Sequence, residues 1–126
     1  MSTLDRRPLM GPDTPEIAGI DTHLGLKSVG GKRERYESLL RKFAGRQGGA
    51  VEAIRAALSV GNTSTAERNA HSLKGAASTL GATALAEHAA LAETAIKTGQ
   101  GADEALDSLS QSLATVVEAI HAALPE

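Results

Sequence analysis

The chain has 126 residues, enough for one domain with a buried core. Its formal net charge of −2 offers no basic surface for nucleic acid, and the absence of cysteine excludes disulfides and thiolate metal sites. No apolar run reaches the roughly 18 residues of a membrane span, and no signal peptide is visible. We therefore expect a cytoplasmic protein with no nucleic-acid partner and no direct membrane contact.

The composition favours packed helices over sheets. Tyr36 and Phe43 are the only aromatic residues, whereas β-sandwiches and barrels are normally rich in aromatic and β-branched strands. Alanine and leucine dominate, with charged residues between them. The sequence therefore predicts an all-α domain.

Residues 1–18 contain Pro8, Gly11, Pro12 and Pro15 and show little periodicity, so we interpret them as a flexible leader or linker. The folded domain is expected to span residues 19–124. It should begin with a short helix from Asp21, a suitable N-cap, to Val29, ending at Gly30–Gly31.

Helical periodicity continues along the rest of the chain. A helix starting near Lys32 should be kinked or ended by Gly45 and Gly48–Gly49, and periodicity then resumes up to Gly61–Asn62. The apolar positions of this stretch are Tyr36, Leu39, Leu40, Phe43, Val51, Ile54, Ala57 and Leu58.

Three further helices are expected. Thr63 or Ser64 can cap the first, where Ser64–Glu67 has capping-box spacing, and Gly81 ends it. The second runs from Thr83 to Gly99 and the third ends before Pro125, with inward residues Leu85, Ala89, Ala92, Ile96, Leu106, Leu109, Leu113, Val116, Ile120 and Ala123. Short connections predict an antiparallel up-down four-helix bundle with a short additional N-terminal helix.

The helix of residues 63–81 carries the clearest candidate for chemistry, His71. At about 100° per residue, its apolar residues form one stripe: Ala66, Ala70, Leu73, Ala77 and Leu80. His71 lies about 150° from the centre of that stripe, so its imidazole should stand in solvent. Lys74 follows one turn later, and Gly75 leaves the position four residues on without a side chain. A glycine inside a helix costs about 1 kcal/mol relative to alanine, so either open access to His71 or close helix packing should explain it.

The run His71-Ser72-Leu73-Lys74-Gly75, followed by small residues and Gly81, resembles the phosphoacceptor helix of histidine phosphotransfer (HPt) domains. These domains are the intermediate carriers of bacterial multistep phosphorelays. The resemblance covers about residues 17–124, and it includes the segments Gly19–Asp21, Val29–Glu34, Tyr36–Phe43 and Leu85–Glu93.

The resemblance implies a phosphocarrier of two-component signalling. It would accept a phosphoryl group on His71 from the aspartate of one response-regulator receiver domain and relay it to the aspartate of another. A hybrid sensor histidine kinase is a further candidate partner, or the parent protein. The sequence has no nucleotide-binding loop and no Asp cluster suited to Mg²⁺. We therefore expect no ATP site, no cofactor and no enzymatic activity in this domain, with Mg²⁺ held by the receiver.

Phosphoryl transfer needs an exposed, neutral imidazole nitrogen. On a helix, the ring nitrogen of a histidine that is directed outward is the distal one, Nε2. Lys74 would stabilise the charge of the transferring group, and Gly75 would let the receiver approach. Glu67, Arg68 and Ser78 are expected on the receiver-facing rim of the same helix.

Glu93 is the candidate supporting residue on the next helix. If the chain reverses near residue 82, His71 and Glu93 each lie eleven residues from the turn, at the same height in an antiparallel pair. The resemblance agrees with a role there, because the family often has Glu or Gln at this offset.

Alternative interpretations make different predictions. A phosphate-independent receiver-binding adaptor would bind receivers without ever forming phosphohistidine. A scaffold or dimerisation bundle would bury His71 and expose a large apolar face; the periodicity does not favour this, so we expect a monomer. His23, His88 and His121 lie on separate segments without the spacing of a helical metal site, so no metal site is predicted.

Overall fold

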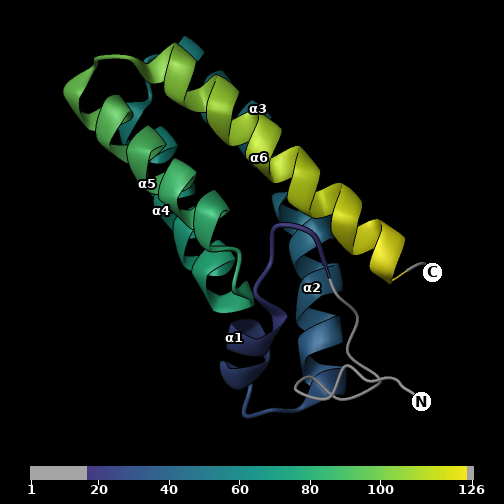
Figure 1. Ribbon diagram of the computed structural model, residues 1–126. Helices are drawn as coiled ribbons and strands as arrows, with labels where there is room; N and C mark the ends of the chain where they lie inside the picture. Colours follow the sequence, from purple (N-terminus) through teal and green to yellow (C-terminus); the bar gives the residue numbers. More distant parts are fainter. Residues whose placement is uncertain (1–16, 125–126) are drawn as a thin grey trace, which may run out of the picture.

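The structure is a computed structural model that describes residues 17–124 (Figure 1). These residues form six helices, and an isolated β-bridge joins Ile17 and Ile20 before the first of them. The helices are α1 (Thr22–Lys27), α2 (Arg33–Gln47), α3 (Ala50–Ser59), α4 (Thr63–Leu80), α5 (Thr83–Thr98) and α6 (Ala102–Ala123).

The predicted all-α four-helix bundle with a short N-terminal helix is confirmed. In Figure 1, α4 and α5 run side by side, and α6 returns along α5. The fourth arm consists of α2 and α3, which both pack against α4 and α6. Connections of two or three residues between α3, α4, α5 and α6 force neighbouring helices to run antiparallel.

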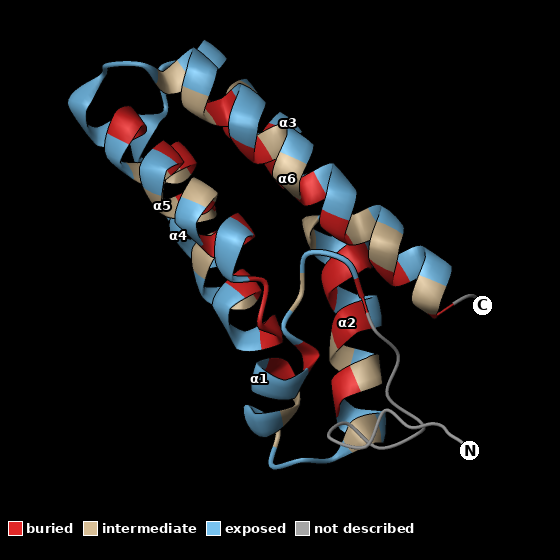
Figure 2. Cartoon of the chain, in the orientation of Figure 1, coloured by how far each residue is buried: buried red, intermediate tan, exposed pale blue. Residues whose placement is uncertain are grey.

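The core is built largely from alanine and leucine. All five residues of the predicted apolar stripe on α4 are buried, and the inner faces of the helices are correspondingly red in Figure 2. Ala66, Ala70 and Ala77 of α4 and Ala89 and Ala92 of α5 are fully buried. Such small side chains let two helix axes approach closely, so these helices pack tightly along their length.

The N-cap of α4 differs from the prediction. Asn62, rather than Thr63 or Ser64, caps this helix: its side-chain oxygen accepts a hydrogen bond from the Thr65 backbone N–H at 3.2 Å. Asn62 has a non-helical backbone and an acceptor of the right length, so Thr63 is already the first helical residue. The other end agrees with the sequence, because Gly81 ends the helix with a φ of 90°.

Two other boundaries are adjusted. The first helix begins after its predicted cap, Asp21, whose side chain accepts from the Leu24 N–H, but it ends at Lys27 rather than at Val29. Gly45 lies inside α2, and the break between α2 and α3 falls at Gly48 and Gly49.

Most of the predicted leader, residues 1–16, lies outside the described residues, so the boundary at residue 18 stays a prediction. Ile17, within that predicted segment, is buried against the core. Across residues 17–124, no helix combines the length and apolar character needed to cross a membrane.

The N-cap of α1 and the buried Tyr36 of α2 both donate hydrogen bonds to the end of α4. The Asp21 N–H donates to Gly81 O at 2.8 Å, and the buried Tyr36 hydroxyl donates to Leu80 O at 2.6 Å. Burial, and secondarily the charge of Asp21, raise the pKa of Tyr36 well above its ordinary value, so its hydroxyl remains a donor. These bonds satisfy carbonyl groups that the last turn of a helix leaves without partners.

Gly25→Ala should destabilise the protein by about 2 kcal/mol or more, because a Cβ there would overlap backbone and ring atoms in a packed seam. The atoms that this Cβ would overlap are the backbone oxygen of Leu80 and the hydroxyl and ring atoms of Tyr36. Urea unfolding of the variant beside wild type measures the loss. Unchanged stability would mean that α1 does not pack against the end of α4 in solution.

Candidate functional site

His71 lies in the middle of α4 on the side away from the core. Its side chain is 66% exposed, as the helical periodicity predicts. A histidine this accessible can be reached by another macromolecule. The scaffold interpretation requires a buried His71 and is therefore not supported.

Glu93 of α5 lies directly beside His71. Its Oε2 is 3.2 Å from His71 Nδ1, and its Oε1 is 3.4 Å from the same nitrogen. The predicted equal height of the two residues is thus confirmed, and the structure also directs Glu93 toward His71. Because Nδ1 faces the carboxylate, Nε2 is the ring nitrogen that remains directed away from it.

Two lysines also form ion pairs with the Glu93 carboxylate. Lys74 Nζ lies 3.4 Å from Oε1, and Lys97 Nζ lies 3.9 Å from Oε2. Sequence reasoning missed Lys97, although its position four residues after Glu93 on one helix was a usable signal. We call His71, Lys74, Glu93 and Lys97 the His71 cluster.

The pKa of Glu93 reflects this environment. Partial burial taken alone would raise the pKa, but the hydrogen bonds from His71 and Lys74 and the charges of both residues outweigh burial and lower it below its ordinary value. The side chain is only 14% exposed. Glu93 is therefore a carboxylate anion held beside Nδ1 of the imidazole.

Glu93→Gln is expected to lower the free energy of unfolding at pH 7, because His71 and Lys74 lose the carboxylate that they stabilise. A depressed folded-state pKa contributes stability above the unfolded-state pKa, and this contribution disappears as the pH falls through the folded-state value. The two proteins should therefore approach equal stability below about pH 4. Urea unfolding at neutral and acidic pH measures this, and a difference that persisted in acid would contradict the assignment.

Gly75 has no packing reason to be glycine. A Cβ placed on it would meet no heavy atom within 4 Å, and the residue is exposed. Its φ also lies outside the left-handed region. The close-packing explanation for Gly75 is therefore wrong, and open access beside His71 is the explanation that remains.

The other predicted site residues also lie on α4. Arg68 and Ser78 are exposed and Glu67 is half-buried. Within residues 17–124, neither a hydrogen bond nor an ion pair joins any of the three to His71. Their placement on the receiver-facing rim stays a prediction.

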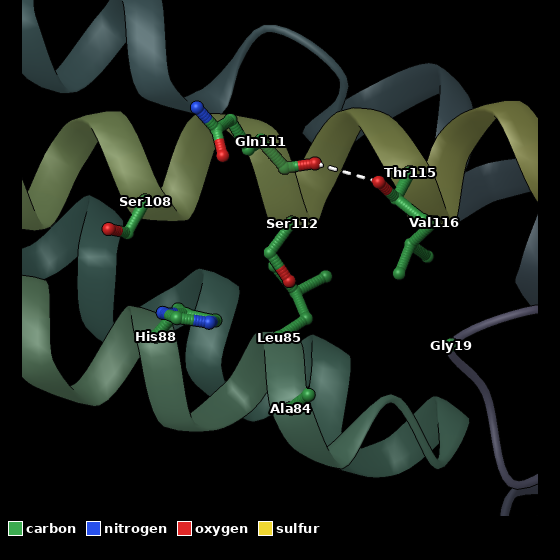
Figure 3. A pocket seen from close by; sticks show the side chains of 9 residues that line it. All are labelled: Gly19, Ala84, Leu85, His88, Ser108, Gln111, Ser112, Thr115 and Val116. Atoms are coloured by element: carbon green, nitrogen blue, oxygen red, sulfur yellow. Dashed lines mark hydrogen bonds between the residues drawn. The ribbon is translucent and has the colours of Figure 1, made fainter.

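The remaining histidines lie apart from His71. His88 lines a hollow of about 400 Å³ between α5 and α6, to which α4 contributes no residue (Figure 3). His23 belongs to α1 and His121 to the last turn of α6. In the part of the chain that the structure describes, no three His, Cys, Asp or Glu side chains are grouped so that they could hold a metal ion.

The comparisons with known proteins identify the family. The family model of the Hpt domain matches residues 38–125, a stretch that contains the whole His71 cluster. Comparisons with curated proteins and with solved structures gave no match. The family match covers well over half of the chain, and it includes the exposed histidine in the middle of α4. The chain therefore belongs to the Hpt domain family, whose members carry phosphoryl groups in two-component phosphorelays.

Proposed function

We propose that His71 is the phosphoacceptor, and that its Nε2 takes a phosphoryl group from the aspartyl phosphate of one receiver domain and passes it to the aspartate of another. Hpt domains are phosphocarriers that interact with receiver domains in general. The observation that carries the assignment to His71 is its exposed imidazole with Nδ1 3.2 Å from the Glu93 carboxylate.

The contact with Glu93 prepares His71 as a nucleophile. With Nδ1 donating its proton to Glu93, the lone pair of the neutral ring lies on Nε2, the nitrogen that faces solvent. A nitrogen–phosphorus bond forms as the bond from phosphorus to the aspartate oxygen breaks, and the aspartate leaves as a carboxylate. The phosphorylated ring, still protonated on Nδ1, carries a positive charge that the Glu93 anion offsets.

Lys74 supplies the second electrostatic contribution. Its ammonium group pairs with Glu93 in the absence of a partner, one turn along α4 from His71. A phosphoryl group arriving on Nε2 brings negative charge close to that lysine, which would then interact with both anions. Lys97 keeps Glu93 paired when Lys74 turns to the phosphoryl oxygens.

The domain is proposed to do this without an ATP site or a cofactor of its own. Mg²⁺ and the acidic groups that bind it would belong to the receiver. A cytoplasmic location, a monomeric state and a hybrid sensor histidine kinase as partner or parent stay predictions.

Transfer from a labelled receiver tests the proposal. The domain is incubated with a phosphorylated receiver and Mg²⁺, the label is examined for stability in acid and alkali, and an unphosphorylated second receiver is then added. A carrier should take up acid-labile, alkali-stable phosphate and lose it to the second receiver. Receiver binding without any such label would instead establish the phosphate-independent adaptor.

A further inference from the structure

A hollow of about 230 Å³ lies on the seam between α3 and α6, where the two helices pack together. Val51 of α3 and Leu113 and Val117 of α6 line it with apolar side chains, and Glu52 and Glu118 line it with carboxylates. We call it the α3–α6 hollow. Neither α4 nor α5 contributes a residue to it, so the hollow is separate from the His71 cluster.

The two glutamates of the hollow have no cation beside them. Glu52 comes from α3 and Glu118 from α6, and both are exposed. Among the described residues, neither carboxylate forms an ion pair or a hydrogen bond with another side chain. An apolar floor with free carboxylates at its edge suits a long basic side chain, whose carbon stem lies on apolar surface while its charged end meets the acids.

Elsewhere on the same seam, the chain supplies such a side chain itself. Arg55 of α3 reaches α6, where its Nη2 donates to Asp107 Oδ1 at 2.7 Å and its Nη1 lies 3.8 Å from Asp103 Oδ1. One guanidinium therefore joins the two helices through two carboxylates. Glu52 of the hollow lies about one turn before Arg55 on α3, and there a pair of carboxylates recurs without an arginine.

The charge of the two helices also favours a cation at this seam. Together α3 and α6 carry five acidic side chains, and Arg55 is their only lysine or arginine, which leaves them with a net charge of −4. Because Arg55 is already paired with Asp103 and Asp107, the excess of negative charge is uncompensated at the hollow. A negative surface attracts cationic partners and speeds their association.

We propose that the α3–α6 hollow is a docking site for an arginine side chain of a partner protein. The stem of that arginine lies on Leu113 and Val117, and its guanidinium pairs with Glu52 and Glu118. Arginine suits this position better than lysine, because its planar guanidinium presents five N–H donors and can pair with two carboxylates at once, as Arg55 does. This docking does not depend on the proposed function.

A titration with a short peptide tests the site on the full chain. The peptide acetyl-Ala-Arg-Ala-amide is added to the ¹⁵N-labelled protein, and its neutral counterpart, with citrulline in place of arginine, is added to a second sample. The arginine peptide should shift the backbone amide signals of residues that line the hollow, with a Kd of about 1 mM, because each exposed ion pair contributes little. The citrulline peptide should bind at least about tenfold more weakly, since it keeps the size of arginine but lacks the charge.

Matched variants that remove charge decide whether the two glutamates hold the peptide. Glu52→Gln/Glu118→Gln is compared with Glu87→Gln/Glu104→Gln, which removes the same charge at two exposed positions outside the hollow. The hollow variant should lose at least about tenfold in affinity for the arginine peptide, and the control less than about threefold. Equal losses in the two variants would overturn the proposal, since they would reflect net charge alone, and so would equal binding of the two peptides to wild type.

Dilution of the protein without peptide distinguishes a partner protein from a second copy of this chain. If the amide signals of the hollow stay unchanged on dilution, the hollow is open in the free protein, as the proposal requires. If they move with protein concentration, a basic side chain of another copy occupies the hollow, and docking of a different protein would be overturned.

Discussion

His71→Gln is expected to abolish phosphate acceptance while leaving the fold intact. Glutamine has no nucleophilic ring nitrogen, so label from a phosphorylated receiver should fall to background. The His71 side chain is 66% exposed and contributes little to the core, and the amide N–H of glutamine can still donate to Glu93. Helical content by circular dichroism and the thermal midpoint should therefore stay close to those of wild type.

His88→Gln is the matched control. His88 is a half-buried histidine on α5 that lines the hollow between α5 and α6, away from the His71 cluster. This variant should take up phosphate as wild type does. If label persisted in His71→Gln but disappeared from His88→Gln, the phosphoacceptor would be His88 and the assignment to His71 would be wrong.

Substitution of Gly75 is expected to separate stability from function. Gly75→Ala should raise the free energy of unfolding by about 1 kcal/mol, because alanine favours the helix and the site has room for a methyl group. The same change narrows the approach to Nε2. We expect transfer to fall by about tenfold for Gly75→Ala and by about a hundredfold for Gly75→Leu, since a displacement of about 1 Å at the reacting atoms has effects of this size.

Urea unfolding and single-turnover transfer from the receiver, measured on the same preparations, test whether stability rises while transfer slows. Ala114→Leu places a leucine side chain at an exposed position of α6 and should leave transfer unchanged. A Gly75 variant that was more stable and equally fast would show that the receiver does not approach over this position.

Much of the architecture could be predicted from periodicity. The stripe of alanines and leucines on α4 has the spacing of one helix face, so burial of that stripe and exposure of His71 follow from helix geometry alone. The helix ends at Gly81 and Gly99, where the glycine has a left-handed backbone, could also be predicted from the sequence. The N-cap of α4 was not, because Asn62, Thr63 and Ser64 are all good capping residues and only the actual backbone path selects one of them.

The candidate site divides in the same way. The local pattern around His71 and Gly75 depends on residues within two turns of one helix, and so the sequence by itself determined the exposed histidine and the missing side chain beside it. Glu93 could be placed at the correct height by counting from the turn, but its rotation about α5 could not. The contacts of its carboxylate with His71 and Lys74 of α4, and the resulting fall in the Glu93 pKa, depend on how α5 is rotated against α4.

Only the tertiary structure shows whether a glycine inside a helix is required by close packing. Gly25 and Gly75 both lie inside helices and look equivalent in the sequence, yet one is pressed against the Leu80 carbonyl and the other faces open space. Likewise, the hollow of about 220 Å³ that is lined by Phe43 of α2 and Ala76 of α4 is formed by helices that are separated along the chain. Local spacing specifies which way a side chain leaves its own helix, whereas what it meets there is set by the packing of other helices.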